Sequence, residues 1–194
     1  MSRVFSRLEE ILGYKFADSK LLEEALTHPS VLPGKNGRKV SYERLELLGD
    51  SVLLCAVVRY LFESHREETE GELSRRRAIL VSSRTLAEIA ERMHLGDYML
   101  LGRGEELNGG RRNPNNLENI LEAVIGAIFM DSNFEVVQNF ILRVWADLDR
   151  KIENIPVDPK TELQEWTQKH FRTLPQYELL LSGPEKFHLR LSVP

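Results

Sequence analysis

Acidic residues lie inside two otherwise apolar runs of this chain, and an apolar run that carries carboxylates can fold in few ways. The first run, residues 41–58, contains Glu43, Glu46 and Asp50. Because burying an unpaired charge is costly, such an acid must be paired, protonated or bound to a metal ion. On a helix, Glu46 and Asp50 stand one turn apart on one face, where their charges repel unless a cation lies between them. The spacing therefore indicates a metal site on a central helix over about residues 42–62.

The second run, residues 116–129, repeats this anomaly. Glu122 lies among apolar neighbours, and Asn119 precedes it by three residues, on the same helical face. If the two helices pack side by side, Glu46, Asp50, Asn119 and Glu122 can converge on one point. A cluster made entirely of oxygen donors suits Mg²⁺ or Mn²⁺ rather than zinc or copper.

Three segments, in order along the chain, carry a family resemblance. Residues 42–51 (Tyr-Glu-Arg-Leu-Glu-Leu-Leu-Gly-Asp-Ser) resemble the ribonuclease III signature, which is close to Asn-Glu-Arg-Leu-Glu-Phe-Leu-Gly-Asp-Ser. Residues 119–127 (Asn-Ile-Leu-Glu-Ala-Val-Ile-Gly-Ala) resemble that family's Asp-x-x-Glu-Ala-Leu-Ile-Gly-Ala segment. Residues 158–165 (Asp-Pro-Lys-Thr-Glu-Leu-Gln-Glu) look like the start of its double-stranded-RNA-binding domain.

The resemblance implies an endoribonuclease that cuts both strands of double-stranded RNA. Such an enzyme hydrolyses phosphodiesters with a divalent cation, Mg²⁺ with Mn²⁺ able to substitute. It leaves 5′-phosphate and 3′-hydroxyl ends with two-nucleotide 3′ overhangs, and its targets include rRNA and mRNA precursors. The family acts as a homodimer that places two active centres across one RNA duplex.

The same resemblance assigns roles to individual residues. Asp50 and Glu122 are expected to be catalytic, and Glu46, Asp50, Asn119 and Glu122 to hold the metal. Glu43 and Glu70 fall on accessory acidic positions, and Leu47 takes the place of an aromatic residue that plugs into the partner. The expected RNA-binding residues are Thr161, Gln164, Glu165 and Lys186.

Asn119 is a departure, since the family usually has Asp at this position. An amide oxygen can coordinate Mg²⁺ but brings no charge, so we expect a weaker metal affinity. The alternative is therefore a protein that binds double-stranded RNA without cleaving it. A second alternative, an all-helical nucleotide hydrolase of another family, would need a signature such as a His-Asp pair, and no such dipeptide occurs.

The expected fold is an all-α endonuclease domain, a helical bundle, followed by a partial α+β double-stranded-RNA-binding domain. We place the first at residues 1–152, a linker at 153–157 and the second at 158–194. Within the first, Asp18 and Asn113 should precede helices, and one helix should span about residues 72–93. The second should contain a helix capped by Asp158 and strands at 176–181 and 187–193. By comparison with the family's binding domain, we expect its third strand and second helix to be missing.

Composition adds weaker constraints. The net charge of −4 argues mildly against a nucleic-acid binder, although carboxylates that hold a cation inflate the acidic count. We expect the Arg75-Arg76-Arg77 run to be a solvated helix face and the single cysteine, Cys55, to lie in the core. No uncharged apolar stretch reaches the roughly 20 residues that span a bilayer, so we expect a cytoplasmic protein without membrane contact.

Overall fold

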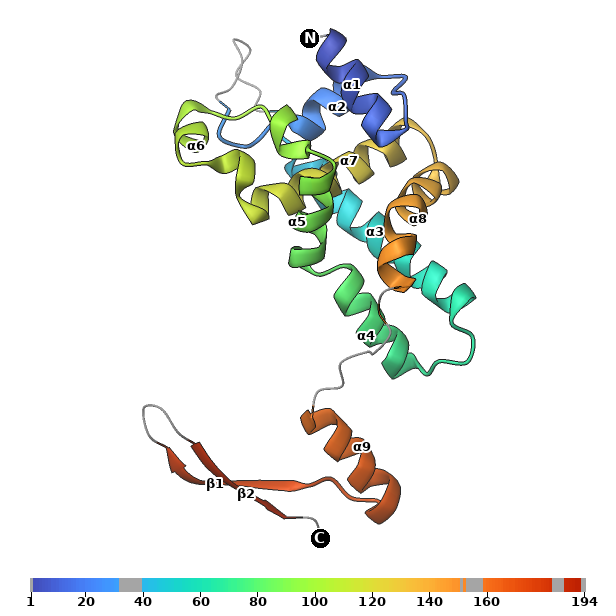
Figure 1. Ribbon diagram of the computed structural model, residues 1–194, viewed down its shortest axis with the longest axis vertical. Helices are drawn as coiled ribbons and strands as arrows, with labels where there is room; N and C mark the ends of the chain where they lie inside the picture. Colours follow the sequence, from blue (N-terminus) through green and yellow to red (C-terminus); the bar gives the residue numbers. More distant parts are fainter. Residues whose placement is uncertain (1, 32–39, 151, 153–158, 183–186, 193–194) are drawn as a thin grey trace. The chain divides into compact units, whose positions relative to one another are not determined.

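A computed structural model describes residues 2–31, 40–150, 152, 159–182 and 187–192, and the chain divides into two compact units, residues 1–153 and 154–194. The first unit is helical (Figure 1). Its elements are α1 (Ser2–Leu12), α2 (Ser19–Leu26), α3 (Glu43–Ser64), α4 (Glu70–Leu80), α5 (Ser83–Arg92), the 3₁₀ turn η1 (Leu95–Tyr98), α6 (Arg103–Leu107), the 3₁₀ turn η2 (Gly110–Arg112), α7 (Pro114–Asp131) and α8 (Phe134–Arg150).

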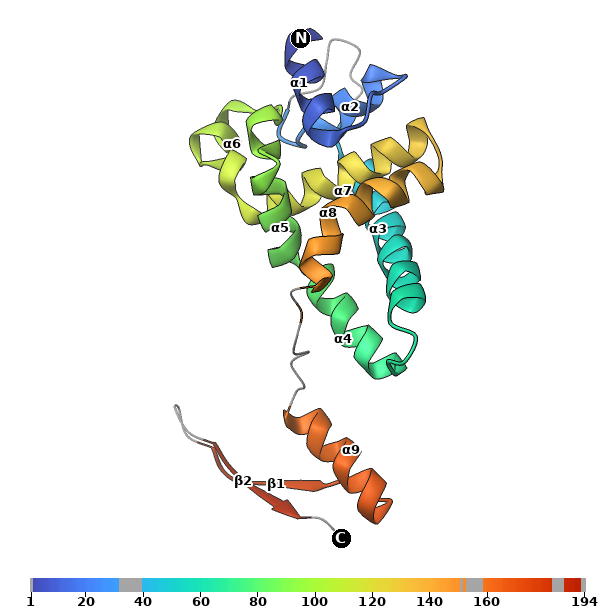
Figure 2. The same ribbon diagram turned by 45° about the vertical axis from the view of Figure 1, so that its right-hand side comes forward.

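Helices α3 and α7 form the centre of this unit. They cross each other, and α2, α5 and α8 pack against α7 (Figures 1 and 2). Helix α7 is buried along most of its length, from Asn116 to Ile128, as its nearly continuous apolar sequence predicts. Its start follows from Asn113, whose side chain accepts a hydrogen bond from the Asn115 amide, and from Pro114 at the first helical position. Asp18 caps α2 in the same way, so the expected cap and the expected helix start at residues 113–115 are both confirmed.

The helix expected over residues 72–93 is in fact two helices, and this prediction was wrong. Ser82 caps the start of α5, because its hydroxyl accepts a hydrogen bond from the Thr85 amide and donates one to the Ile79 carbonyl. The indole of Trp145 donates to the carbonyl of Leu80, in the last turn of α4. These side chains satisfy the backbone groups that a continuous helix would have paired.

Two further expectations are corrected by burial. Cys55 is exposed on α3, because the face of α3 that carries it is not covered by other elements of the described chain. Arg76 is buried rather than solvated, and it pairs with Glu68 at 2.7 Å and with the buried Asp149 at 3.3 Å. His65 lies between the same two carboxylates. This ionic cluster fastens α4 to the ends of α3 and α8.

The second unit contains α9 (Pro159–Phe171) and the antiparallel strands β1 (Gln176–Ser182) and β2 (Phe187–Ser192). In the register, Tyr177 lies opposite Leu191 and Glu178 opposite Arg190, whose side chains form an ion pair at 3.0 Å. The expected cap Asp158 and the connection at residues 183–186 lie outside the described residues. A helical unit followed by a helix and a two-stranded sheet confirms the expected fold class. Across the described part of the chain, none of the helices combines the length and the apolar character needed to cross a bilayer.

Candidate metal centre

Two glycines let α3 and α7 approach each other at the point where their acids lie. A Cβ atom at Gly49 would overlap the Glu122 carbonyl oxygen, and one at Gly126 would overlap the Leu45 carbonyl oxygen. The two backbones are therefore in direct contact beside Glu46 and Asp50 on α3 and Glu122 on α7. The glycines thus account for the close approach of acids that are more than 70 residues apart in the sequence.

Glu122 is the most perturbed of these acids. Its residue is 8% exposed, and burial raises the pKa of its carboxyl to about 8, with further contributions from Asp50, Glu118 and Glu46. Burial likewise raises the pKa of Glu46, followed by the charges of Glu43, Glu118 and Asp50. Since neighbouring carboxylates disfavour the ionisation of both Glu46 and Glu122, the two helices share one electrostatic site. Perturbed acids of this kind are typical of functional sites.

Glu118 is a member of this site that the sequence interpretation missed. It is half-buried on α7 and raises the pKa of both Glu46 and Glu122. Its spacing carried a usable signal, because Glu118 and Glu122 are four residues apart, as are Glu46 and Asp50. The site is therefore lined by a pair of carboxylates on each of the two helices.

Asn119 is half-buried and lies at the edge of this site. Its side-chain nitrogen donates a hydrogen bond of 3.5 Å to the hydroxyl of Tyr42, a buried residue just before α3. The structure thus brings Asn119 to the N-terminal end of the helix that carries Glu46 and Asp50. All four residues expected to hold a metal lie around the crossing of α3 and α7.

The donor set at this crossing consists of carboxylate and amide oxygens, which suits a hard divalent cation. Over the described ranges, no three acidic, histidine or cysteine side chains already stand in a geometry that could hold a metal ion. The carboxylates of Glu46, Asp50 and Glu122 would therefore have to turn toward a shared point. A bound dication would favour that movement. Its positive charge would offset the repulsion between the carboxylates and the cost of ionising the buried Glu122.

The two accessory acids lie at opposite ends of α3. Glu43 is exposed at its first turn and accepts a hydrogen bond of 2.6 Å from the Ser41 hydroxyl. Glu70 is exposed at the start of α4 and lines a groove with Phe62, near the C-terminal end of α3. Phe62 follows Glu46 by 16 residues, which is about 24 Å along a helix, so Glu70 is remote from the acid site of its own chain.

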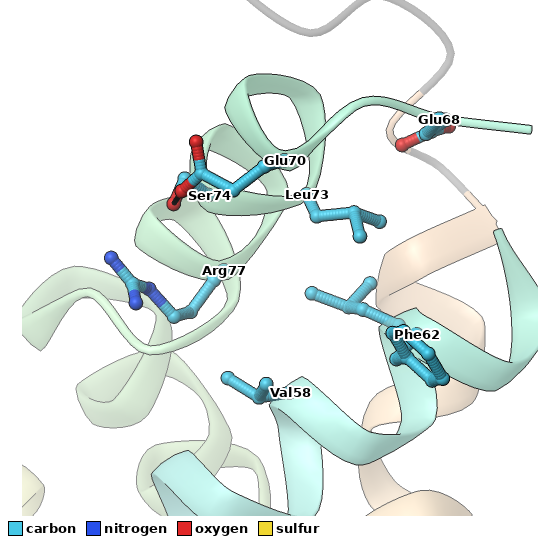
Figure 3. Close-up of a pocket in the computed structure, with 8 residues that line it drawn as sticks. Val58, Phe62, Glu68, Glu70, Leu73, Ser74 and Arg77 are labelled. Atoms are coloured by element: carbon cyan, nitrogen blue, oxygen red, sulfur yellow. Dashed lines mark hydrogen bonds between the residues drawn. The ribbon is translucent and has the colours of Figure 1, made fainter. Parts of the chain in front are cut away.

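The groove between α3 and α4 is apolar with a charged rim (Figure 3). Val58 and Phe62 come from α3, and Leu73 points toward them from α4 (Figure 3). Glu70, Ser74 and Arg77 line the α4 side, where the Ser74 hydroxyl donates to Glu70 at 3.0 Å. The groove lies beside a row of exposed apolar residues on α3, namely Leu47, Leu54, Val58 and Phe62.

The expected RNA-binding residues belong to the second unit and lie apart from the acid site in the sequence. Thr161, Gln164 and Glu165 are all on α9, with Gln164 half-buried and Glu165 exposed. Nothing is described of the Thr161 side chain, and Lys186 lies outside the described residues. The spacing of residues 161, 164 and 165 places these three positions on one face of α9.

Comparison with known proteins identifies close relatives. A family model described as ribonuclease-III-like matches residues 18–148. The ribonuclease 3 of Wolbachia pipientis subsp. Culex pipiens (strain wPip) is 48% identical over 179 residues, covering 91% of this chain and 78% of the relative. That of Rickettsia typhi (strain ATCC VR-144 / Wilmington) is 43% identical over 178 residues, covering 91% of this chain and 78% of the relative.

Solved structures agree with these relatives. The nuclease domain of ribonuclease III from Campylobacter jejuni, described for flexibility in a region involved in dimer formation, matches with a TM-score of 0.67 and 42% identity. The match covers 72% of this chain and 94% of that domain. Dicer from Pichia stipitis matches at 20% identity with a TM-score of 0.53, over 91% of this chain and 81% of that protein, and supports the fold alone.

Proposed function

The chain belongs to the ribonuclease III family and is a metal-dependent endoribonuclease of double-stranded RNA, and from that premise we propose that Mg²⁺ binds where α3 and α7 cross. The proposed ligands are Glu46, Asp50, Asn119 and Glu122, with Mn²⁺ as a substitute. The observation that carries the proposal is the buried Glu122, whose pKa is raised to about 8 by burial and by neighbouring carboxylates. A buried acid in this setting is stabilised by a bound dication.

Each proposed ligand contributes differently to the reaction. A bound divalent cation supplies Lewis acidity at the scissile phosphate and an activated water. Asp50 is exposed and Glu46 half-buried, so the α3 side of the site is open to a substrate. Glu122 lies deepest, and its ionised carboxylate would supply negative charge to the cation from the buried side of the site. Asn119 adds a neutral oxygen, which supports a lower cation affinity than a fourth charged ligand would give.

The exposed face of α3 supports a homodimer. Leu47 and Phe62 are 72% and 73% exposed, and they lie at the two ends of the apolar row that includes Leu54 and Val58. A twofold axis near the middle of this row would bring Leu47 of one protomer to the groove beside Phe62 of its partner. The same symmetry would carry Glu70 toward the partner's acid site, which supports its accessory role.

Domain roles follow the sequence boundaries. We assign catalysis to residues 1–152, a linker to 153–157 and double-stranded-RNA binding to 158–194. Thr161, Gln164 and Glu165 on α9 would contact the minor groove, where recognition depends on shape and on 2′-hydroxyl groups. Processing of rRNA and mRNA precursors in the cytoplasm is the biological role that this assignment supports.

The non-cleaving alternative depends on Asn119 alone, and the retained carboxylates at 46, 50 and 122 argue against it. The test is incubation of labelled duplex RNA with the protein and Mg²⁺ or Mn²⁺. We expect products with 5′-phosphates and two-nucleotide 3′ overhangs from the unchanged chain. Glu122→Gln should bind the duplex but yield no products. Cleavage by that variant would remove Glu122 from the site, and binding without cleavage by the unchanged chain would favour the alternative.

A further inference from the structure

Tyr42 is held rigidly beside the proposed metal centre. Its residue is 2% exposed, its backbone amide donates to the Thr27 carbonyl at 2.9 Å, and its own carbonyl accepts from the Glu46 amide at 2.8 Å. Its ring meets the His28 ring edge-on, with centroids 5.6 Å apart. The His28 ring is itself fixed, because its Nδ1 accepts a hydrogen bond of 3.0 Å from the Ser30 amide. The phenol of Tyr42 therefore has little freedom to move.

The Tyr42 hydroxyl is connected to the acid site by Asn119. It accepts the hydrogen bond from the side-chain nitrogen of Asn119, at 3.5 Å. Burial raises the pKa of this hydroxyl, the hydrogen bond from Asn119 lowers it in part, and the charges of Glu46, Glu43 and Glu105 raise it again. The hydroxyl is consequently neutral at physiological pH and can both accept and donate a hydrogen bond.

An asparagine in a metal site has an orientation problem that an aspartate lacks. Its amide has an oxygen at one end and a nitrogen that only donates at the other, and a cation requires the oxygen. In the absence of a cation, neighbouring carboxylates attract the amide N–H groups instead. The nitrogen must therefore be occupied elsewhere if the oxygen is to face the carboxylates.

We propose that Tyr42 is a positioning residue, whose hydroxyl holds the nitrogen of Asn119 and so turns the amide oxygen toward Glu46 and Glu122. This inference rests on the proposed metal site. Asn119 carries an amide where the family segment has a carboxylate, so its two ends differ and its orientation matters. The hydrogen bond between its nitrogen and the Tyr42 hydroxyl is the contact that would fix this orientation.

The test is Mn²⁺ binding to the full chain without RNA, measured from the electron paramagnetic resonance signal of free Mn²⁺. Tyr42→Phe removes one oxygen atom and should raise the Kd for Mn²⁺ about tenfold, the lower end of the loss typical when a supporting partner of a ligand is removed. In an Asn119→Asp background the same change should alter the Kd by less than about twofold, because both ends of a carboxylate are oxygens. Tyr60→Phe is the matched control, since the Tyr60 hydroxyl donates to Asp149 instead, and it should leave the Kd unchanged.

The outcomes distinguish a failure of the positioning role of Tyr42 from a failure of the proposed metal site. If Glu122→Gln abolishes Mn²⁺ binding but Tyr42→Phe binds like the unchanged chain, the site stands and the positioning role is wrong. An equal loss from Tyr42→Phe with and without the Asn119→Asp substitution would also overturn it, because the effect would then not pass through the amide. If the unchanged chain and Glu122→Gln bind Mn²⁺ alike, the metal site itself fails and the role of Tyr42 fails with it.

Discussion

Glu122 should make the metal-free protein less stable as the pH rises, and Glu122→Gln should remove that dependence. Burial raises the pKa of this carboxyl to about 8 in the folded chain, against 4.5 for an unperturbed glutamate. Between these values the folded protein keeps a proton that the unfolded chain releases, so the free energy of unfolding falls as pH increases. The slope reaches 1.36 kcal/mol per pH unit only well between the two pKa values, so the loss from Glu122 is about 3 to 4 kcal/mol between pH 5 and pH 8.

Trp145 provides the assay. It is buried in the first unit, and its indole donates to the Leu80 carbonyl, whereas Trp166 lies half-exposed in the second unit. In a Trp166→Phe background, fluorescence during urea unfolding therefore reports on the first unit. With chelator present, the stability of Glu122→Gln relative to the unchanged chain should rise by about 3 to 4 kcal/mol from pH 5 to pH 8. Mn²⁺ at pH 8 should stabilise the unchanged chain and not the variant.

A matched control separates burial from the simple loss of a charge. Glu88→Gln deletes a carboxylate on the exposed face of α5, where Glu88 pairs with Arg84 at 2.9 Å. Its stability curve should run parallel to that of the unchanged chain. Parallel curves for Glu122→Gln as well, within about 0.5 kcal/mol, would refute the claim that Glu122 is buried in its protonated form.

Three other substitutions test the crossing, the ligand set and the dimer. Gly49→Ala should destabilise the first unit by about 3 kcal/mol or more in the same urea assay, because its Cβ would overlap the Glu122 carbonyl; Gly104→Ala meets no atom within 4 Å and should stay within about 1 kcal/mol. Asn119→Asp should keep or raise cleavage and lower the Mg²⁺ concentration needed in a titration; a sharp loss would contradict a ligand role for the amide. Leu47→Glu should shift the protein from dimer to monomer in sedimentation without loss of helix; an unchanged dimer would place the interface elsewhere.

Local sequence signals account for much of the fold. Asp18 was identifiable as a cap, and residues 113–115 as a helix start, because a short polar side chain before an apolar periodic segment satisfies the first free amides of a helix. The acids on α3 and α7 stood out because their neighbours are apolar. Both signals act within a few residues, which is the range over which sequence alone is informative.

The features that sequence did not reveal depend on contacts between distant segments. The break between α4 and α5 at Ser82 is stabilised in part by Trp145, which lies 63 residues away. Arg76 is buried because Asp149 comes from another helix, and Cys55 is exposed because nothing in the described chain covers its face of α3. Glu118 is different, since its spacing of four residues from Glu122 is visible in the sequence. It was missed because we looked only for acids with apolar neighbours.

Anomalous scattering from Mn²⁺-soaked crystals tests the central claim most directly. The account predicts a peak at the crossing of α3 and α7, at the roughly 2.0–2.2 Å expected for small hard cations from oxygens of Glu46, Asp50 and Glu122. The peak should vanish in Glu122→Gln. A fully occupied Mn²⁺ elsewhere, with these three side chains turned away from one another, would contradict it.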